Sequence, residues 1–417
     1  MASPEVAGDR PLDSLRHENF KRFIAGATIA NCGQFIQGLA TPFLMNELTG
    51  SPAWVGAAGF ASLAPSIVFT PIAGALTDRL DRHKMLLVAY SIVTSASLLY
   101  LGLFIADLLT PLRIIFIQLA FGGVIGFLFA PIQAMPAVLV PPADLMNSVR
   151  TLSMSFTGSR ALGPLIGGIA LAVSGPGLAF GLAAIAFGIG LAIVARVKTT
   201  QEIATEPFEK SLLSDYREGL AFIRERPGLR LAIRNGFALG FLAAAIVFPL
   251  AASVARDVLD TGGGGLGALG FALGLGSIMA SIVMAGPGSR VPLATMETVS
   301  LLLYIVGLVT IAATGWFTIG LVGFFVMGVA HMWHNVSLST SMQLAVTDEV
   351  RGRVMSVWMV FLLAGIPLGA LIGGFVASAT STRTVVLAYA VLLALFLVFS
   401  WLRFDRMQAL NPKPASV

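Results

Sequence analysis

Charge and cysteine are both scarce in this chain of 417 residues. Only 11% of the residues are charged, whereas about a quarter are charged in soluble domains, so the composition excludes an ordinary water-soluble fold. The single cysteine, Cys32, has no partner within the chain with which to form a disulfide. Hydrophobic residues make up 56% of the sequence, and this excess predicts a membrane protein.

Acidic residues are missing from the interiors of the long apolar runs. Those nearest to the runs are assigned to span ends or links, and they are Glu47, Asp107, Asp144, Asp257, Asp260 and Glu297. No G-x-x-x-x-G-K-[ST] sequence occurs, and the two G-x-G-x-x-G matches, at Gly262 and Gly265, follow no strand. The sequence therefore predicts no nucleotide, no other cofactor and no ATP-driven pump.

The apolar runs predict an all-α membrane protein with twelve transmembrane helices. A spanning helix needs about 20 apolar residues. The predicted spans are 22–46, 53–77, 85–106, 113–139, 148–173, 177–195, 231–255, 265–286, 294–314, 317–344, 352–379 and 383–403. An even number places both termini on one side of the membrane.

Basic residues gather on that side. Of the 26 lysines and arginines, 22 lie in segments on the side of the termini, and Arg160 lies within a span. The other side holds Arg113, Arg256 and Arg383. The positive-inside rule then places both termini in the cytoplasm of a cell bounded by a plasma (bacterial inner) membrane. These loops also account for the pI near 9.7, so a nucleic-acid partner is not expected.

A polar segment separates two groups of six spans. Within it, Leu212, Leu213, Tyr216, Leu220 and Ile223 recur at helical spacing among charged residues, which predicts an amphipathic helix on the cytoplasmic face. This helix is either a passive link or a docking site for a partner. The predicted division is a tail at 1–21, a first bundle at 22–195, a linker at 196–230, a second bundle at 231–403 and a tail at 404–417.

The two halves repeat. The sequence LGPLIGG in span 5 aligns with LGALIGG in span 11 at an offset of 206 residues. A repeat of this kind predicts two six-helix bundles related by an axis along the membrane normal. The small-residue positions of the two motifs are Gly163, Pro164, Gly167 and Gly168, and Gly369, Gly373 and Gly374.

A short charged loop, GALTDRLDRHK at 74–84, joins spans 2 and 3. Its pattern resembles the loop between helices 2 and 3 of the major facilitator superfamily, and the alternative is an ordinary positive-inside loop. The resemblance implies a latch at the cytoplasmic gate, in which Asp78 meets the start of span 11 near Gly352 and Gly74 lets span 2 pack closely. The gate residues are Gly74, Asp78, Arg79, Arg82 and Lys84. Asp81 stands where the family has glycine, and the second copy at 286–290 lacks the acid.

The span 5 motif resembles the G-P-x-x-G-G signature of exporters in this superfamily, although generic packing of small residues is the alternative. The stretches HENFKRFIAG, LTGSPAWVG and RGRVMSVW are similar to the branch of drug and siderophore exporters. The resemblance implies a monomeric secondary transporter that moves lipophilic or amphipathic molecules outward by alternating access, with protons as a candidate coupling ion.

Other functions stay open at this stage. The chain could be an uncoupled facilitator, or a lysophospholipid or metabolite transporter. A membrane-embedded enzyme would need an acid or metal constellation that the sequence does not show, and a transport-dead sensor would not need the gate loop. We therefore expect no enzyme activity.

Three features inside the spans are candidates for the substrate or proton cavity. Asn31, Gln34, Gln37 and Thr41 form a polar stripe on span 1 within about 120°. Arg160 is costly in a membrane unless it faces a wet cavity or a partner. His331 and His334 share one face of span 10 with Asn335 nearby, and histidine titrates near neutral pH.

The competing reading of each feature is a buried hydrogen bond that only packs helices together. No third ligand accompanies the histidines, so no metal is expected. With no acid placed deep in a span, proton coupling would have to use Asp78, the histidines or an acid nearer the rim than assigned.

Overall fold

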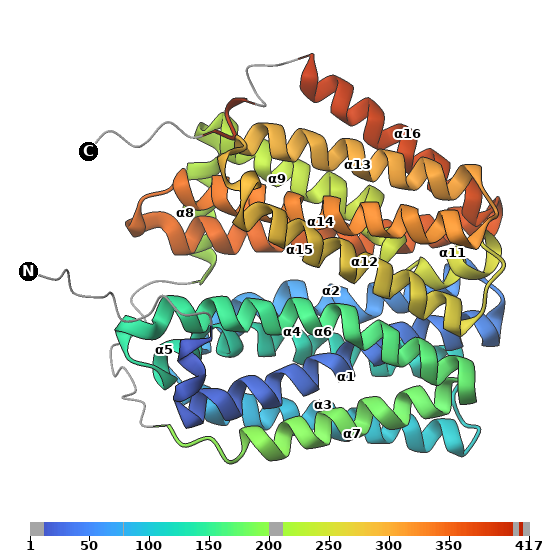
Figure 1. Ribbon diagram of the computed structural model, residues 1–417, viewed down its shortest axis with the longest axis horizontal. Coiled ribbons are helices and arrows are strands. Elements are labelled where there is room, and N and C mark those ends of the chain that lie inside the picture. Colours follow the sequence, from blue (N-terminus) through green and yellow to red (C-terminus); the bar gives the residue numbers. More distant parts are fainter. Residues whose placement is uncertain (1–11, 78, 200–211, 403–407, 412–417) are drawn as a thin grey trace, which may run out of the picture.

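The computed structural model describes residues 12–77, 79–199, 212–402 and 408–411, and every regular element in these ranges is helical. Figure 1 shows two groups of helices with roughly parallel axes, one from each half of the chain. The first group contains η1 Asp13–Arg16, α1 Glu18–Thr49, α2 Pro52–Thr77, α3 Arg82–Ile105, α4 Pro111–Ala134, α5 Pro136–Leu139, η2 Pro142–Asp144, α6 Leu145–Ser174 and α7 Pro176–Val194.

The second group follows α8 Leu212–Glu225. It contains α9 Pro227–Leu239, η3 Gly240–Ala244, α10 Ala245–Val247, α11 Ala251–Asp257, α12 Gly263–Ala285, η4 Pro287–Arg290, α13 Leu293–Ala313, α14 Phe317–Leu344, α15 Asp348–Ala379 and α16 Thr382–Trp401. We call the end of the molecule with the α2–α3 link and the start of α15 the basic end. The end with the α1–α2 and α15–α16 links is the opposite end (Figure 1).

In the described residues, eleven helical stretches are long and apolar enough to cross a membrane. The other predicted span corresponds to α1, a continuous helix of 32 residues that ends at Gly50 in the left-handed conformation (φ 60°). Its polar stripe and the charged residues in its first turns make it less apolar than the others. Because α1 packs along α6 and α7, it completes the twelve-helix arrangement.

The seventh span is not the continuous helix predicted over 231–255. It runs as α9, a π-helical turn (η3) and the short α10, then breaks at Phe248–Leu250 before α11. Pro249 explains the break, because proline lacks the N–H that would continue the helix. The fourth predicted span is also interrupted, at Met135 before Pro136, so α4 ends at Ala134.

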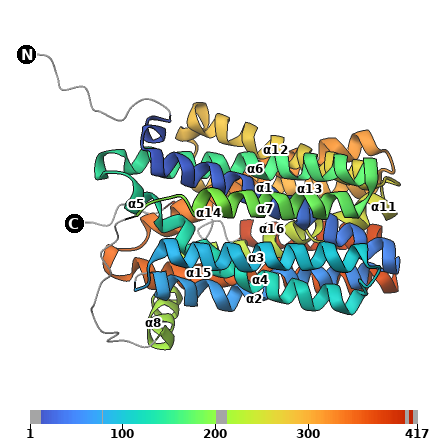
Figure 2. The same cartoon turned by 90° about the horizontal axis from the view of Figure 1, so that it is seen from below.

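The two groups touch most closely toward the opposite end, where glycines let the backbones meet. A Cβ on Gly168 of α6 would lie 2.3 Å from Cα of Gly267 on α12. A Cβ on Gly374 of α15 would lie 3.1 Å from Cα of Gly56 on α2. Figure 2 shows α12 beside α6 and α15 beside α2, in agreement with these contacts.

The basic end lacks such close approaches at the corresponding glycines. A Cβ on Gly74 of α2, Gly158 of α6 or Gly352 of α15 would meet no atom within 4 Å. The prediction that Gly74 lets the end of α2 pack closely is therefore wrong for this conformation. The molecule is closed between its halves at the opposite end, and its halves are less tightly packed against each other at the basic end.

Two segments seal the second group at its basic end. In α8, Glu218 forms a 2.7 Å ion pair with Arg353 of α15, and Ile223 is buried against the same helix group. After α16, the segment Gln408–Asn411 returns to the bundle: the Leu410 side chain is fully buried, and its carbonyl accepts a 2.8 Å hydrogen bond from the Ser341 hydroxyl of α14. Asn411 Oδ1 accepts a 3.0 Å hydrogen bond from the backbone N–H of Ala294, in the first turn of α13.

Candidate functional site

Arg160 reaches from α6 across to the broken seventh span. Its guanidinium carbon lies 4.6 Å from the centre of the Phe248 ring, a cation–π contact between the two halves of the chain. Its Nε is buried with no hydrogen-bond partner among the described residues. A cation in this position favours an anionic group as its missing partner.

Phe248 connects Arg160 to the tenth span. The ring of Phe248 meets His331 edge to face, with centroids 5.2 Å apart, and His331 Nδ1 lies 2.7 Å from the hydroxyl of Tyr304 on α13. The charge of Arg160 interacts electrostatically with both Tyr304 and His331. These four residues form a mixed group of aromatic and polar side chains where the two halves meet, and we call it the Arg160 cluster.

The two histidines share one face of α14, as their spacing predicts, and both are buried. They contact different partners on α13: His331 contacts Tyr304, and His334 contacts Glu297. Asn335 lies beside this face but donates a 2.7 Å hydrogen bond to the carbonyl of His331 within its own helix. The histidines thus belong to two adjacent sites.

Glu297 lies near the start of α13, where the sequence places it, but it is buried among helices. Its side chain is fully buried, and both carboxylate oxygens lie 3.0 Å from His334 Nδ1. The carboxylate also accepts hydrogen bonds from Asn235 Nδ2 of α9 at 3.1 Å and from the Ser337 hydroxyl at 2.9 Å. Sequence reasoning assigned Glu297 to a span end because the apolar run begins only a few residues before it. Its spacing from Ser300 and Tyr304, which places all three on one helix face, was the signal that could have identified it.

The polar stripe of α1 divides between two environments. Gln37 is buried, and its Oε1 accepts a 2.7 Å hydrogen bond from Ser97 of α3, so it packs helices within the first group. Thr41 is also fully buried. Asn31 is buried and Gln34 is half-buried. The structure therefore gives Gln37 the packing role that was the alternative for this stripe.

The repeated small-residue motifs make equivalent contacts in the two halves. In α6, Gly163 and Gly167 pack against α1, whereas Gly168 packs across the interface against α12. In α15, Gly369 and Gly373 pack within the second group. Gly374 packs across the interface against α2. Pro164 lies inside α6 and contacts Gly270 of α12.

The charged loop between α2 and α3 ties helix ends together. Arg82 donates to the carbonyl of Thr77 at 3.2 Å and to that of Ala134 at 3.5 Å, at the ends of α2 and α4. His83 Nε2 lies 2.9 Å from the carbonyl of Val194 at the end of α7. Basic groups at helix C-termini are stabilising. Arg79 lies in the loop itself, and Lys84, in the first turn of α3, pairs with Asp81 at 4.0 Å. Asp78 and the latch predicted for it lie outside the described residues.

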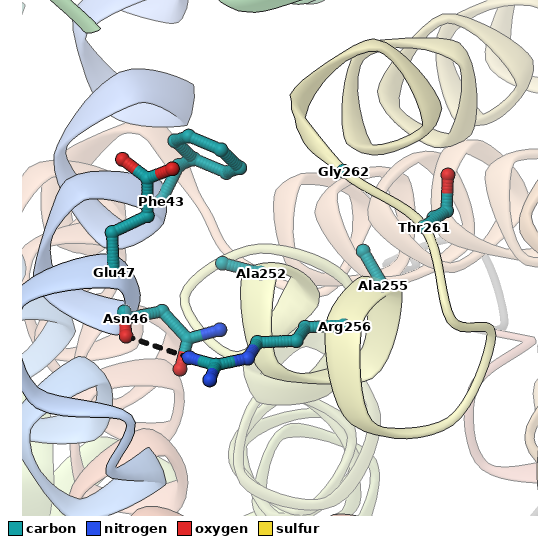
Figure 3. A pocket seen from close by; sticks show the side chains of 8 residues that line it. All are labelled: Phe43, Asn46, Glu47, Ala252, Ala255, Arg256, Thr261 and Gly262. Carbon is teal, nitrogen blue, oxygen red and sulfur yellow. Dashed lines mark hydrogen bonds between the residues drawn. The ribbon is translucent and has the colours of Figure 1, made fainter. Parts of the chain in front are cut away.

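A pocket of about 400 Å³ lies at the opposite end, between α1 and α11. Figure 3 shows Phe43, Asn46 and Glu47 on one side, facing α11 and the link to α12. Arg256 of α11 crosses the pocket and donates a 2.8 Å hydrogen bond to the carbonyl of Asn46. This bond joins the two halves where they are closed.

Comparisons with known proteins agree with this arrangement. Residues 10–416 match the family described as transmembrane secretion effector, a family of the MFS type. The enterobactin exporter EntS of Escherichia coli is 26% identical over 411 residues, which cover 92% of this chain and 92% of EntS. The MFS-type transporter y4rN of Sinorhizobium fredii is 27% identical over 355 residues, which cover 81% of this chain and 83% of y4rN.

Two solved structures share the fold. A bacterial homologue of the human lysosomal transporter Spinster, in an inward-facing and unoccupied conformation, superposes with a TM-score of 0.73 at 14% identity, covering 99% of this chain and 100% of that one. The nucleoside transporter NupG superposes with a TM-score of 0.71 at 14% identity, covering 95% of this chain and 100% of NupG.

Proposed function

The chain belongs to the transmembrane secretion effector family of the major facilitator superfamily, and from this membership we propose that it exports amphipathic small molecules. It works by alternating access: the bundles at 22–195 and 231–403 move as two units around a central site. Protons flowing inward drive the export. Both termini and the basic end lie in the cytoplasm, as the excess of basic residues at that end supports.

The observation that carries the proposal is the Arg160 cluster. Arg160 and Phe248 belong to different halves of the chain, so a substrate held there is contacted by both moving units. The buried Nε of Arg160 supplies an unsatisfied donor, and the half-buried Phe248 supplies an aromatic ring, which packs against His331 and is supported through it by the buried Tyr304. This combination fits a molecule that carries aromatic rings and an anionic or acidic group, such as a catecholate. Similarity to an enterobactin exporter supports the same substrate class.

Transport by proteoliposomes tests this function, with enterobactin as the probe under an imposed pH gradient. Wild-type protein is expected to move the probe, and Arg160→Gln to weaken its binding by about tenfold to a hundredfold, because hydrogen bonds to charged groups contribute about 1.5–3 kcal/mol. Arg160→Lys, which keeps the charge, should recover part of the affinity. Arg113→Gln, on the α3–α4 side of the molecule, is the matched control and should have no effect.

Three other outcomes would each contradict one part of the proposal. Equal transport by Arg160→Gln and wild type would remove Arg160 from the site. Probe movement that ignores the pH gradient would replace the proton-driven exporter with an uncoupled facilitator. If a panel of catecholates, lipophilic cations and lysophospholipids yields movement of the lipid alone, the chain transports lipid or a related metabolite and the proposed substrate class is wrong.

A further inference from the structure

A line of buried polar side chains runs between α13 and α14, beginning at the Arg160 cluster. We call it the polar seam. Its members recur every three or four residues on the facing sides of the two helices, and all are buried. They are Tyr304, Ser300 and Glu297 on α13, and His331, His334, Ser337 and Ser341 on α14.

The centre of the polar seam is an acid–base pair. His334 Nδ1 lies 3.0 Å from both oxygens of Glu297. When the carboxylate is ionised it can only accept, so Nδ1 is the donor and Nε2 is the free basic nitrogen. Nε2 is buried and has no hydrogen-bond partner among the described residues. Burial without a partner costs free energy that a packing role does not require, and a position that accepts a proton explains it.

Apart from His334, the described groups that hydrogen-bond to Glu297 are neutral. From α9, Asn235 donates to Glu297 but is neutral, and the neighbouring Arg234 points to α16, where it lies over the rings of Phe396 and Phe399. From α14, Ser337 is neutral, and His331 bonds to Tyr304 instead. Within the described part of the chain, His334 is therefore the titratable group that faces Glu297 directly. The carboxylate of Glu297 and the free Nε2 of His334 are both proton acceptors, so the pair offers two adjoining places for one proton.

We propose that Glu297 and His334 form the site at which the coupling proton binds during the transport cycle. A proton arriving at His334 Nε2 is balanced by transfer of the Nδ1 proton to Glu297. The products are a neutral carboxylic acid and a neutral imidazole, so the net charge of the pair goes from −1 to 0. This inference rests on the proposed export function.

The polar seam also explains how this site and the substrate site would communicate. His331 belongs to the Arg160 cluster and lies one helical turn from His334 on α14. The Ser300 hydroxyl, buried without a partner among the described residues, lies between Tyr304 and Glu297 on α13. An anion bound at Arg160 and a proton bound at Glu297 would therefore act on the same pair of helices. Toward the basic end, Ser341 and the carbonyl of Leu410 continue the line.

The competing explanation is that these polar groups only hold three helices together. The two explanations differ in the effect of neutralising the acid. Glu297→Gln keeps the size of the side chain and its ability to bond to Ser337, but it cannot take up a proton. Ser337→Ala removes one hydrogen bond to Glu297 and no titratable group, so it is the matched structural control.

Reconstituted protein allows gradient-driven transport, gradient-free exchange and proton flux to be measured side by side with enterobactin as the probe. Glu297→Gln is expected to retain exchange and to lose both the response to the pH gradient and the substrate-dependent proton flux. Ser337→Ala should keep the wild-type ratio of protons to substrate. Gradient-driven transport by Glu297→Gln, or loss of coupling in both variants together, would overturn the proposal.

Two further measurements keep the test independent of folding and of the substrate. If Glu297→Gln does not yield folded protein, His334→Gln is expected to flatten the pH profile of transport, and an unchanged profile would contradict the proposal. If wild-type protein does not move enterobactin, the proposed export fails separately. Infrared titration of the carboxyl stretch then decides on the proton site: the band should be lost in Glu297→Gln and kept in the exposed control Asp107→Asn. A band that survives in Glu297→Gln would exclude Glu297.

Discussion

Asp81 forms the N-cap of α3, although it stands where the resembling loops of the family have glycine. Its carboxylate accepts hydrogen bonds from the backbone N–H groups of His83 and Lys84 at 3.0 and 3.1 Å. Two of the free N–H groups at the start of α3 are thereby satisfied.

Replacing this cap should weaken the loop without changing transport chemistry. Asp81→Ala is expected to lower the free energy of unfolding by about 1 kcal/mol, as loss of an N-cap does, whereas Asp81→Asn should stay close to wild type. Thermal unfolding of the detergent-solubilised protein measures the difference. An alanine variant as stable as wild type would show that water replaces the carboxylate at no cost.

At the scale of single residues, sequence reasoning identified Arg160, His331 and His334 but could not pair them. Arg160 contacts Phe248, 88 positions later in the chain, through a break in the seventh span that only the structure reveals. Glu297 was missed because hydropathy places the start of its span correctly but does not show whether a side chain near a span end faces water or the neighbouring helices.

Among the elements, the helix crossings decide which end of the molecule is closed. The repeat in spans 5 and 11 was visible in the sequence, and its small residues indicated that these helices pack closely against others. The partners of Gly168 and Gly374 were not visible, because the glycines Gly267 and Gly56 belong to the other half of the chain. Hydropathy could not predict the π-helical turn or the break in the seventh span, because it shows only that the segment is apolar. π-Helical turns occur often at functional sites, and this one precedes Phe248.

A side chain at either crossing should force the halves apart at the opposite end. In Gly168→Val, the new Cβ would lie 2.3 Å from Cα of Gly267, so the backbones must separate. We expect faster alkylation of a cysteine placed at Ala255, which is buried in the pocket there, in a Cys32→Ser background. Gly181→Val is the matched control, because a Cβ at Gly181 would meet no atom within 4 Å. An unchanged alkylation rate in Gly168→Val would mean that this crossing does not control the closure.

For the whole molecule, the sequence predicted the twelve helices, their two groups and the sidedness of the basic residues. These features depend on composition and length, which are local properties of the chain. The conformation was not predictable, because it depends on which of two interfaces is packed. Contacts at Gly168, Gly374 and Arg256 place the packed interface at the opposite end.

The orientation in the membrane is directly testable with two cysteine variants in the Cys32→Ser background. Ser381 is exposed in the α15–α16 link, and Lys198 is exposed after α7 at the basic end. Ser381→Cys is expected to react with a membrane-impermeant maleimide added outside intact cells. Lys198→Cys should react only after the membrane is permeabilised. The reverse pattern would show that the molecule lies in the membrane in the opposite orientation, and the proposed export would then be import.

The return of Gln408–Asn411 to the second group has a consequence for biogenesis. Leu410 and Asn411 leave the ribosome after all the spanning helices, yet they bind α13 and α14, which were synthesised much earlier. The groove that receives Leu410 therefore stays unfilled while α15 and α16 are being inserted. Packing of the second bundle at this end is therefore completed only after α16 has been synthesised, so a bulky insertion close to Asn411 would interfere with maturation of the protein before it interfered with its activity.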